Sequence, residues 1–589
     1  MKKIIPFLVF ALAFLFWYLF YPNHVGNQEF FSIFQTTPSF FMSRCVEPGG
    51  LAAWIGAFFS QFYRWIGVGA FLQALSAVGL YLLLRYNKAF SQLKGEEGVL
   101  ALFPVVCLLF LQTGYAFLMG NTLQVLAWFG FFWGYSRMKS QPVRMFWACL
   151  GSFLSFPLFG ALPAILWLVT FVIYELSQSG KSIGLVWPII IWIGCAWGWR
   201  TYFPINDEVW CTFFPGVFEF NAAGIAWILY LWLPLRYILI WLKKVRKEPR
   251  QSLRRSWGCV AGCVVLLGFL CWGKKEFYQP QLEYVLGLQR SVVKEKWDEV
   301  LKSAQKYSGK TPAYGCSMIN LALAKKGELA ERALDFPQTG EEGLLQPLNN
   351  DYFSMFCNTY VYELLDVANE GLHWNIELSI SLGDNPPPYL LKRTAELLMK
   401  LGKESAAVKY LKNLLVVPFY KDWAKENLAR ISKVEFQRKL QLNVPYQADI
   451  AGKTVVQERT DDFFVGIYGL LYDLYQLSVL RPNNEAVRDY LLTGLLLQKD
   501  VMAFYDHFRR YYPEGRSSNL PRLYREALVS IRFSSVDPNV FLKYEVKGNE
   551  QDRFRIYINR YKAFSDKKLA AQALEKEFGN TYWYYLHFK

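Results

Sequence analysis

The chain has 589 residues, of which 53% are hydrophobic and 18% are aromatic. These fractions exceed those of ordinary soluble domains, and the length exceeds what one hydrophobic core needs, so we expect two unlike parts. The net charge of +16 comes almost wholly from the part before residue 276. The basic residues there lie between apolar runs, where they orient membrane helices instead of forming a phosphate-binding face. This arrangement disfavours nucleic-acid binding.

The apolar runs before residue 276 predict a polytopic transmembrane domain of helices, 1–275. A helix that crosses the hydrocarbon layer needs about 20 apolar residues, with every backbone polar group bonded inside it. The first run starts like a signal peptide, but it is long and lacks a small-x-small cleavage site, so we interpret it as a retained helix. The nine predicted spans are approximately 4–21, 66–84, 98–115, 121–135, 145–158, 161–177, 183–199, 222–242 and 257–273.

The basic residues of alternate loops predict the orientation of these spans. Sixteen Lys and Arg residues lie in one set of loops, whereas the other set holds only Arg44, Arg64 and Arg200. Because basic residues resist translocation, the first set and the N-terminus are expected in the cytoplasm. An odd number of spans then places the rest of the chain on the outer side of the membrane.

The first outer loop, 24–65, is too apolar to be wholly solvated. After a Pro-Gly-Gly turn at 48–50, the stretch LAAWIGAFFSQFYRW places Ser60, Gln61 and Arg64 on one helical side and aromatic residues on the other. A pattern of this kind is typical of a helix that lies in the membrane interface. We expect no membrane-embedded ion pair, because none of the predicted spans shows paired charges, and this disfavours an ion-coupled transporter.

Residues 276–589 predict a second, all-helical domain outside the cytoplasm. Two helical patterns, 390–399 and 404–415, flank Gly402, which supplies a tight turn. This is the layout of a tetratricopeptide-like repeat, and it predicts an α-solenoid. Sel1-like or other α-solenoid repeats remain alternatives, because the spacing between copies is irregular.

Two further copies of the helix–turn–helix pattern support this prediction. The stretch SMINLALAKKGELAERALDF turns at Gly327, and the stretch 484–512 turns at Lys499-Asp500, where Gly would be usual. A repeat array presents a concave surface suited to a protein or peptide partner, so we expect the domain to bind or scaffold a partner in the cell envelope. The alternative is that the helices only brace the membrane domain.

The cysteines predict neither a zinc site nor a fixed disulfide framework, because the sequence has no CxxC motif and no Cys/His cluster. Cys45 with Cys211, and Cys316 with Cys357, would lie outside the cytoplasm and could form disulfides if geometry allows. No cofactor is expected.

Two stretches carry a resemblance to a known family. They are YPNHVGNQEFFSIFQTTPSFF followed by PGGLAAWIGAFFSQFYRWIGVGA, and PPPYLLKRTAELLMKLGKESAAVKYLKNLLVVPFYKDWA. The chain resembles a Bacteroidetes-type family of polytopic membrane proteins of unknown function with a C-terminal tetratricopeptide-like domain. The resemblance implies residence in the inner membrane of a Gram-negative envelope, with the helical-repeat domain in the periplasm. It implies no activity.

The layout is also distantly similar to that of polytopic glycosyltransferases that use lipid-linked sugars. In such enzymes a carboxylate in an outer loop acts as base or metal ligand, and this implies Glu29, Asp207 and Glu208 as catalytic candidates. His24 and Arg200 become candidate phosphate contacts, and a divalent metal is implied only under this reading. The chain departs from the pattern at Glu29, where an Asp is expected in the first outer loop.

Overall fold

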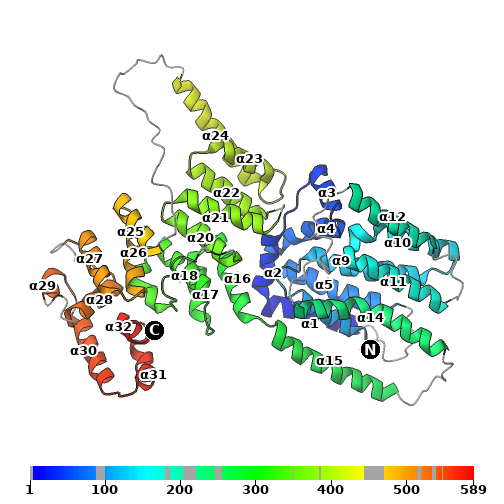
Figure 1. Cartoon of the computed structure of the whole chain (residues 1–589), viewed down its shortest axis with the longest axis horizontal. Coiled ribbons are helices and arrows are strands. Elements are labelled where there is room, and N and C mark those ends of the chain that lie inside the picture. The colour runs from blue at the N-terminus through cyan, green and yellow to red at the C-terminus, as the bar shows by residue number, and fades with distance from the viewer. Residues whose placement is uncertain are drawn as a thin grey trace. The chain divides into compact units, whose positions relative to one another are not determined.

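The computed structural model describes a helical protein (Figure 1). One isolated bridge, between Thr339 and Glu341, is the extent of β-pairing in the part of the chain that the structure describes. The all-α fold class predicted from the sequence is confirmed there. The described residues are 4–87, 100–178, 186–202, 220–245, 255–347, 349, 351–383, 386–442, 470–513, 519–533, 537, 539–546 and 548–589.

The chain divides into two compact units. Unit 1 is formed by Met1–Glu283 together with two short later segments, Asn385–Pro388 and Asn413–Ala424. The rest of the chain forms unit 2. The later sequence therefore contributes to the core of unit 1 at two places, which no local pattern in the sequence predicted.

Unit 1 contains helices of very different lengths. Its first helix, α1, passes directly into a π-helical turn, η1, and short helices follow before the first long one. These elements are α1 (Ile4–Leu15), η1 (Phe16–Phe20), α2 (Pro22–Asn27), η2 (Gln28–Phe31), α3 (Pro38–Cys45), α4 (Gly50–Ser60), η3 (Gln61–Arg64), α5 (Ile66–Arg85), α8 (Leu102–Leu111), α9 (Met119–Arg137), α10 (Gln141–Phe159), α11 (Ala161–Gln178), α12 (Val186–Tyr202), α14 (Phe220–Val245) and α15 (Arg255–Phe277).

The prediction of nine membrane spans is wrong as a count. Each predicted run contains a helix, but in the described part of the chain only three helices are both long and apolar enough to cross a bilayer: Ile66–Arg85, Gln141–Phe159 and Ala222–Leu242. The fragment Leu102–Leu111, for example, is only 10 residues long. Such a helix spans roughly 15 Å, about half of the hydrocarbon thickness. Apolar composition alone predicted the helices but not their lengths.

The first predicted span is bent. Ile4–Phe20 and the stretch Pro22–Phe31 meet at an angle of 82°, so they give a fourth candidate span only if counted as one broken segment. Pro22 explains the position of the bend, because proline lacks an N–H and is tolerated only at the start of a helix. The backbone N–H groups of Asn23 and His24 instead donate to the Glu283 carboxylate, at 2.6 and 2.9 Å.

The helix predicted after the Pro-Gly-Gly turn is confirmed as α4, and its buried side is made of small residues. A Cβ atom on Gly56 would lie 2.2 Å from the backbone nitrogen of Gly120, so only glycine permits this crossing of α4 and α9. Ser60 is also buried and donates to the Gly56 carbonyl at 2.9 Å. Of the three residues expected on the polar side, Ser60 therefore faces protein, whereas Gln61 and Arg64 are half-buried in η3.

Unit 2 consists of helices joined mostly by short turns. A short 3-10 turn, η5 (Ala333–Asp335), follows α19 (Leu329–Arg332). The helices that lie wholly or mostly in this unit are α16 (Pro280–Val293), α17 (Trp297–Lys306), α18 (Ala313–Lys325), α19 (Leu329–Arg332), α20 (Tyr352–Leu364), α21 (Ala368–Ser381), α22 (Pro388–Lys400), α23 (Glu404–Leu414), α24 (Lys421–Leu442), α25 (Leu470–Leu480), α26 (Glu485–Leu497), α27 (Val501–Tyr511), α28 (Arg522–Phe533), α29 (Val540–Lys543), α30 (Gly548–Lys562), α31 (Lys567–Phe578) and α32 (Tyr582–Phe588).

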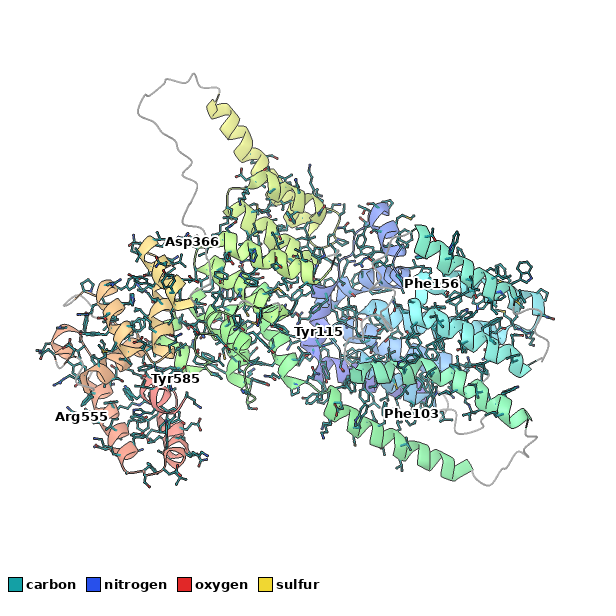
Figure 2. The ribbon with its side chains drawn as sticks, viewed as in Figure 1. Phe103, Tyr115, Phe156, Asp366, Arg555 and Tyr585 are labelled. Carbon is teal, nitrogen blue, oxygen red and sulfur yellow. The ribbon has the colours of Figure 1, made fainter. Side chains whose placement is uncertain are left out.

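Five of the described helix pairs share one turn geometry. In each, a residue with positive φ lies two positions after the first helix ends and two before the next begins. Its N–H donates to the carbonyl three residues earlier, and the following N–H donates to the carbonyl five residues before it, at 2.8–3.1 Å. This is the Schellman arrangement, which satisfies the last carbonyls of a helix. The five residues are Glu295, Gly327, Asp366 (Figure 2), Gly402 and Lys499.

Candidate functional site

The structure describes three of the five site residues that the sequence predicted. His24 is buried in α2, and Glu29 is half-buried in η2. Arg200 lies in α12, whereas Asp207 and Glu208 lie outside the described residues. Two of the five residues thus lie outside the described part of the chain, and the roles proposed for all five stay predictions.

His24 belongs to a buried polar cluster in unit 1. Its Nε2–H donates to the backbone carbonyl of Gln112 at 3.0 Å. The Gln112 side chain in turn donates to the hydroxyls of Ser76 at 3.2 Å and Thr122 at 3.0 Å. Gln73 is fully buried, and neither of its amide atoms has a hydrogen-bond partner among the described residues. The cluster ties together α2, α5, α9 and the end of α8, and its residues are too far apart in sequence for a local motif to reveal them.

An ion pair in unit 1 joins two apolar helices. Arg144 directly precedes the predicted span 145–158, so the expectation that no predicted span carries paired charges is not contradicted. Glu175, near the end of α11, lies 3.0 Å from the Nε of Arg144 on α10. Tyr135 of α9 also donates to this carboxylate through its hydroxyl. Glu175 was missed because a single acid near the end of an apolar run gives the same pattern as an ordinary helix end. The triad joins three helices and supplies the bonds that a buried charge requires.

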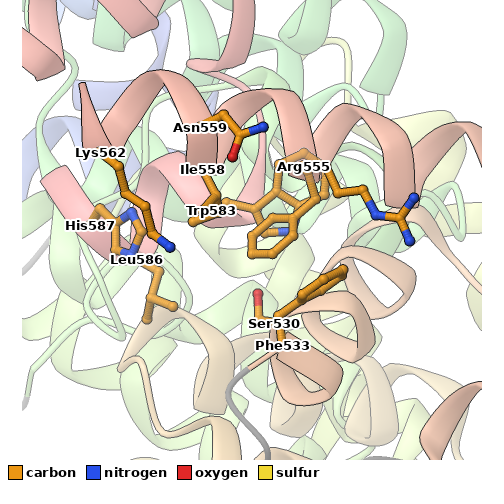
Figure 3. A pocket seen from close by; sticks show the side chains of 10 residues that line it. Ser530, Phe533, Arg555, Ile558, Asn559, Lys562, Trp583, Leu586 and His587 are labelled. Carbon is orange, nitrogen blue, oxygen red and sulfur yellow. The ribbon is translucent and has the colours of Figure 1, made fainter. Parts of the chain in front are cut away.

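A groove of about 610 Å³ in unit 2 is the candidate functional site (Figure 3). It lies between α28, α30 and α32. Phe533, Phe554 and Trp583 line it with aromatic rings, of which Phe533 is the exposed one, while Arg555 and Lys562 carry positive charge. Figure 3 shows Trp583 between Arg555 on one side and Lys562 on the other. The remaining lining residues are Ser530, Ile558, Asn559, Leu586 and His587.

Helix α30 sets the distance between the two charges of the groove. Arg555 and Lys562 are two helical turns apart, about 10 Å along the axis, so both project from the same side. Arg555 also lies 3.4 Å from Asp552, but both side chains are largely exposed, and such a pair contributes little. The Lys562 side chain is exposed. The rim therefore keeps a net positive charge.

Helix α32 is held in place by Glu526 of α28. The Glu526 carboxylate accepts from the backbone N–H of Tyr582 at 2.7 Å, and its backbone carbonyl accepts from the indole of Trp583 at 2.9 Å. The Tyr557 hydroxyl lies 2.7 Å from Nδ1 of His587. These bonds fix two of the groove residues on the short last helix, which is only 7 residues long.

The electrostatics of the groove region depend on burial. Burial raises the pKa of Glu526 to about 7, and the hydrogen bond from Tyr582 and the charge of Arg522 offset only part of that effect. Burial lowers the pKa of His587, and the charges of Lys567 and Lys499 lower it further. His587 is consequently neutral near pH 7, so the positive charge of the groove comes from Arg555 and Lys562.

The described residues hold no group of three or more His, Cys, Asp or Glu side chains that could bind a metal ion. Cys45, Cys316 and Cys357 are free thiols, and Cys211 lies outside the described residues. The groove thus offers apolar surface, hydrogen-bonding groups and positive charge. Such a set of groups suits binding. No local sequence pattern predicted the groove, because other elements lie between its three helices in the chain.

The fold is therefore that of an all-helical protein, and the groove between α28, α30 and α32 is its candidate binding surface. Comparison with known proteins adds the family: the chain matches the family of unknown function DUF6057 over residues 1–589 and belongs to it. No curated protein matches the chain, and no solved structure does. The resemblance to a family of unknown function is thereby confirmed, whereas its Bacteroidetes-type and tetratricopeptide-like details stay predictions.

Proposed function

We propose that the protein is a multi-pass protein of the inner membrane whose helical unit 2 lies in the periplasm and binds a protein or peptide partner. The groove between α28, α30 and α32 is the binding site in this proposal. The observation that carries it is the combination of an aromatic floor with the positive charges of Arg555 and Lys562.

Exposed apolar side chains support membrane residence. Val68, Phe71 and Leu75 are exposed on α5, although this helix is one of the three candidate spans. They recur at helical spacing and form one apolar stripe. Exposure of such a stripe to water would be unfavourable, whereas contact with lipid chains would not, so the pattern favours a helix at the lipid boundary.

The shared turn geometry supports a repeat array in unit 2. Four of the five turn residues, Glu295, Gly327, Asp366 and Gly402, follow each other at intervals close to the length of a tetratricopeptide repeat of about 34 residues. Repeat arrays of this kind bind extended peptides or protein surfaces. The tetratricopeptide-like assignment is part of the proposal.

The chemistry of the groove favours an acidic, partly apolar peptide. Phe533 is partly exposed and offers apolar contact, while Asn559 offers donors and an acceptor for a peptide backbone. Two cationic side chains about 10 Å apart match carboxylates spaced along an extended chain. Charge complementarity at the rim determines which partner is favoured, and the exposed ring of Phe533 adds apolar contact.

A binding experiment with a defined probe tests the proposal. Full-length protein in lipid nanodiscs is titrated against a fluorescent peptide of alternating leucine and glutamate, and anisotropy is measured. We expect saturable binding that weakens by about tenfold or more in the double variant Arg555→Glu/Lys562→Glu, because both rim charges are reversed.

The matched control changes the same charge elsewhere. Lys568→Glu/Lys576→Glu alters two exposed lysines of α31 that do not line the groove, and it should bind the peptide as the parent protein does. A peptide with lysine in place of glutamate should bind weakly to the parent and to the control variant, and better to Arg555→Glu/Lys562→Glu, whose rim charges are reversed. Equal loss of affinity in both double variants, or equal binding of the two peptides, would reject the groove as the binding site.

A further inference from the structure

The turn between α23 and α24 is docked on the first loop of the chain. This turn, 415–420, belongs to the segment Asn413–Ala424 of unit 1. The Thr36 N–H donates to the Val416 carbonyl at 3.3 Å, and the Val417 side chain is 1% exposed. The turn is therefore part of the packed structure of unit 1.

Phe419 of this turn completes a patch of aromatic side chains. Its ring centroid lies 5.6 Å from that of Trp65 and 6.1 Å from that of Phe62, both in edge-to-face geometry. Phe58 contacts Phe62 at 5.4 Å. The Arg64 guanidinium lies 5.0 Å from the centre of the Phe419 ring. We call Phe58, Phe62, Trp65 and Phe419 the aromatic patch.

The aromatic patch is exposed although its members contact each other. Phe58 is 41%, Trp65 is 49% and Phe419 is 47% exposed. Phe419 also has a φ of +65°. A bulky residue in this left-handed region costs roughly 1–2 kcal/mol, which glycine would avoid. Backbone strain that keeps an aromatic ring on the surface indicates that the ring has a role outside the fold.

The position of the aromatic patch identifies what covers it. Trp65 directly precedes α5, a candidate span whose Phe71 and Leu75 are exposed further along the same helix. Aromatic residues at the end of a span lie at the level of the lipid headgroups, where their rings contact acyl chains and headgroups together. The nearby cationic side chains of Arg64 and Lys421 suit lipid phosphates.

We propose that the turn 415–420 is a membrane-interface anchor, in which Phe419 and the rest of the aromatic patch insert among phospholipid headgroups. This inference rests on the membrane residence proposed above. It adds a second lipid contact, made by a segment far from the apolar helices in sequence.

Lipid-depth quenching tests the anchor in the full-length protein. The variants Phe419→Cys, Lys421→Cys, Phe71→Cys and Leu542→Cys are each labelled with an environment-sensitive fluorophore and placed in nanodiscs. Lipids carry a nitroxide quencher near the headgroup or near the chain end, and signal from the natural cysteines is subtracted. Lys421→Cys keeps the Phe419 ring, so one label reports on the turn even if loss of the ring alters folding.

We expect both turn labels to be quenched mainly by the headgroup-level nitroxide, about twofold or more above the label at residue 542, which is 86% exposed on α29. The Phe71 label should be quenched by the deeper nitroxide. Turn labels that behave like the residue 542 label, while the Phe71 label is quenched, would overturn the anchor alone. Absence of quenching at Phe71 as well would overturn the membrane residence on which it rests.

Discussion

Glu526 is a buried carboxyl beside the groove, and its ionisation makes the stability of this region depend on pH. Its pKa in the folded protein is about 7, against an ordinary value of 4.5, because burial penalises the charged form. The folded protein therefore binds this proton more tightly than the unfolded chain does. The contribution of this group to stability is unchanged below about pH 4.5, falls as the pH rises towards about 7, and stays at its lower level above that.

The first prediction is that α32 loosens as the pH rises from about 5 to about 8. The cost at α32 is at most about 3 kcal/mol. Hydrogen exchange of the last helix in the full-length protein, corrected for the intrinsic rate, should show falling protection. Glu526→Gln keeps an acceptor for the Tyr582 N–H but cannot ionise, so this fall in protection should be absent from it. The lowered pKa of His587 acts in the opposite direction in both proteins. A similar pH slope in both proteins would contradict the assignment.

The second prediction concerns Glu29, the residue on which the glycosyltransferase alternative depends. If an outer carboxylate acts as base or metal ligand, Glu29→Gln should abolish the cellular function while the protein still folds, because the change is nearly isosteric. If partner binding is the function, Glu29→Gln should behave as the parent, and Arg555→Glu/Lys562→Glu should not. We expect the second result in a complementation assay, with protein levels measured alongside.

At the scale of the elements, the shared turns can be tested in two directions: by adding a side chain at a turn glycine and by replacing a turn residue with glycine. A Cβ atom on Gly402 would meet nothing within 4 Å, so any cost of a side chain there is conformational. Gly402 has a φ of +71°, and Lys499 has one of +65°. We predict that Gly402→Val destabilises by about 1 kcal/mol or more, and that Lys499→Gly stabilises by up to about 1 kcal/mol.

These changes are measured as shifts in thermal unfolding of the full-length protein and as local hydrogen exchange in the two hairpins. Gly402→Asn is the matched control, because asparagine adopts the left-handed region more easily than valine does. It should fall between the parent and Gly402→Val. Equal effects of asparagine and valine would show that the turn conformation does not limit stability.

The same turns show how much of the fold could be predicted from the sequence. Gly327 and Gly402 were predictable because glycine favours the left-handed conformation, and Lys499 was found from its flanking helices. Glu295 and Asp366 adopt the same φ with no compositional sign. In unit 1 the apolar runs predicted helices but not the bend at Pro22. The groove combines residues of α28, α30 and α32, and such a tertiary arrangement leaves no local pattern.

At the scale of the whole molecule, orientation is the property that the basic residues predict most directly. A reporter active only in the periplasm, fused after Lys589, should be active, and a cytoplasmic reporter should be silent. Nine spans from a cytoplasmic N-terminus give this result, whereas counting the bent pair and the three candidate spans as four crossings does not. A cytoplasmic signal would therefore mean an even number of crossings, with the bent segment as the first suspect.

The return of Asn413–Ala424 to unit 1 has a consequence for how the protein is made. Chains emerge from the ribosome N-terminus first, and domains generally fold in that order. The surface formed by Phe62 and Trp65 is synthesised early, but Phe419 follows only after α16 to α23. Unit 1 cannot complete its packing until α16 to α23 have been translated. A nascent chain that stalls before residue 413 would present an unfinished aromatic surface, which chaperones or proteases could recognise.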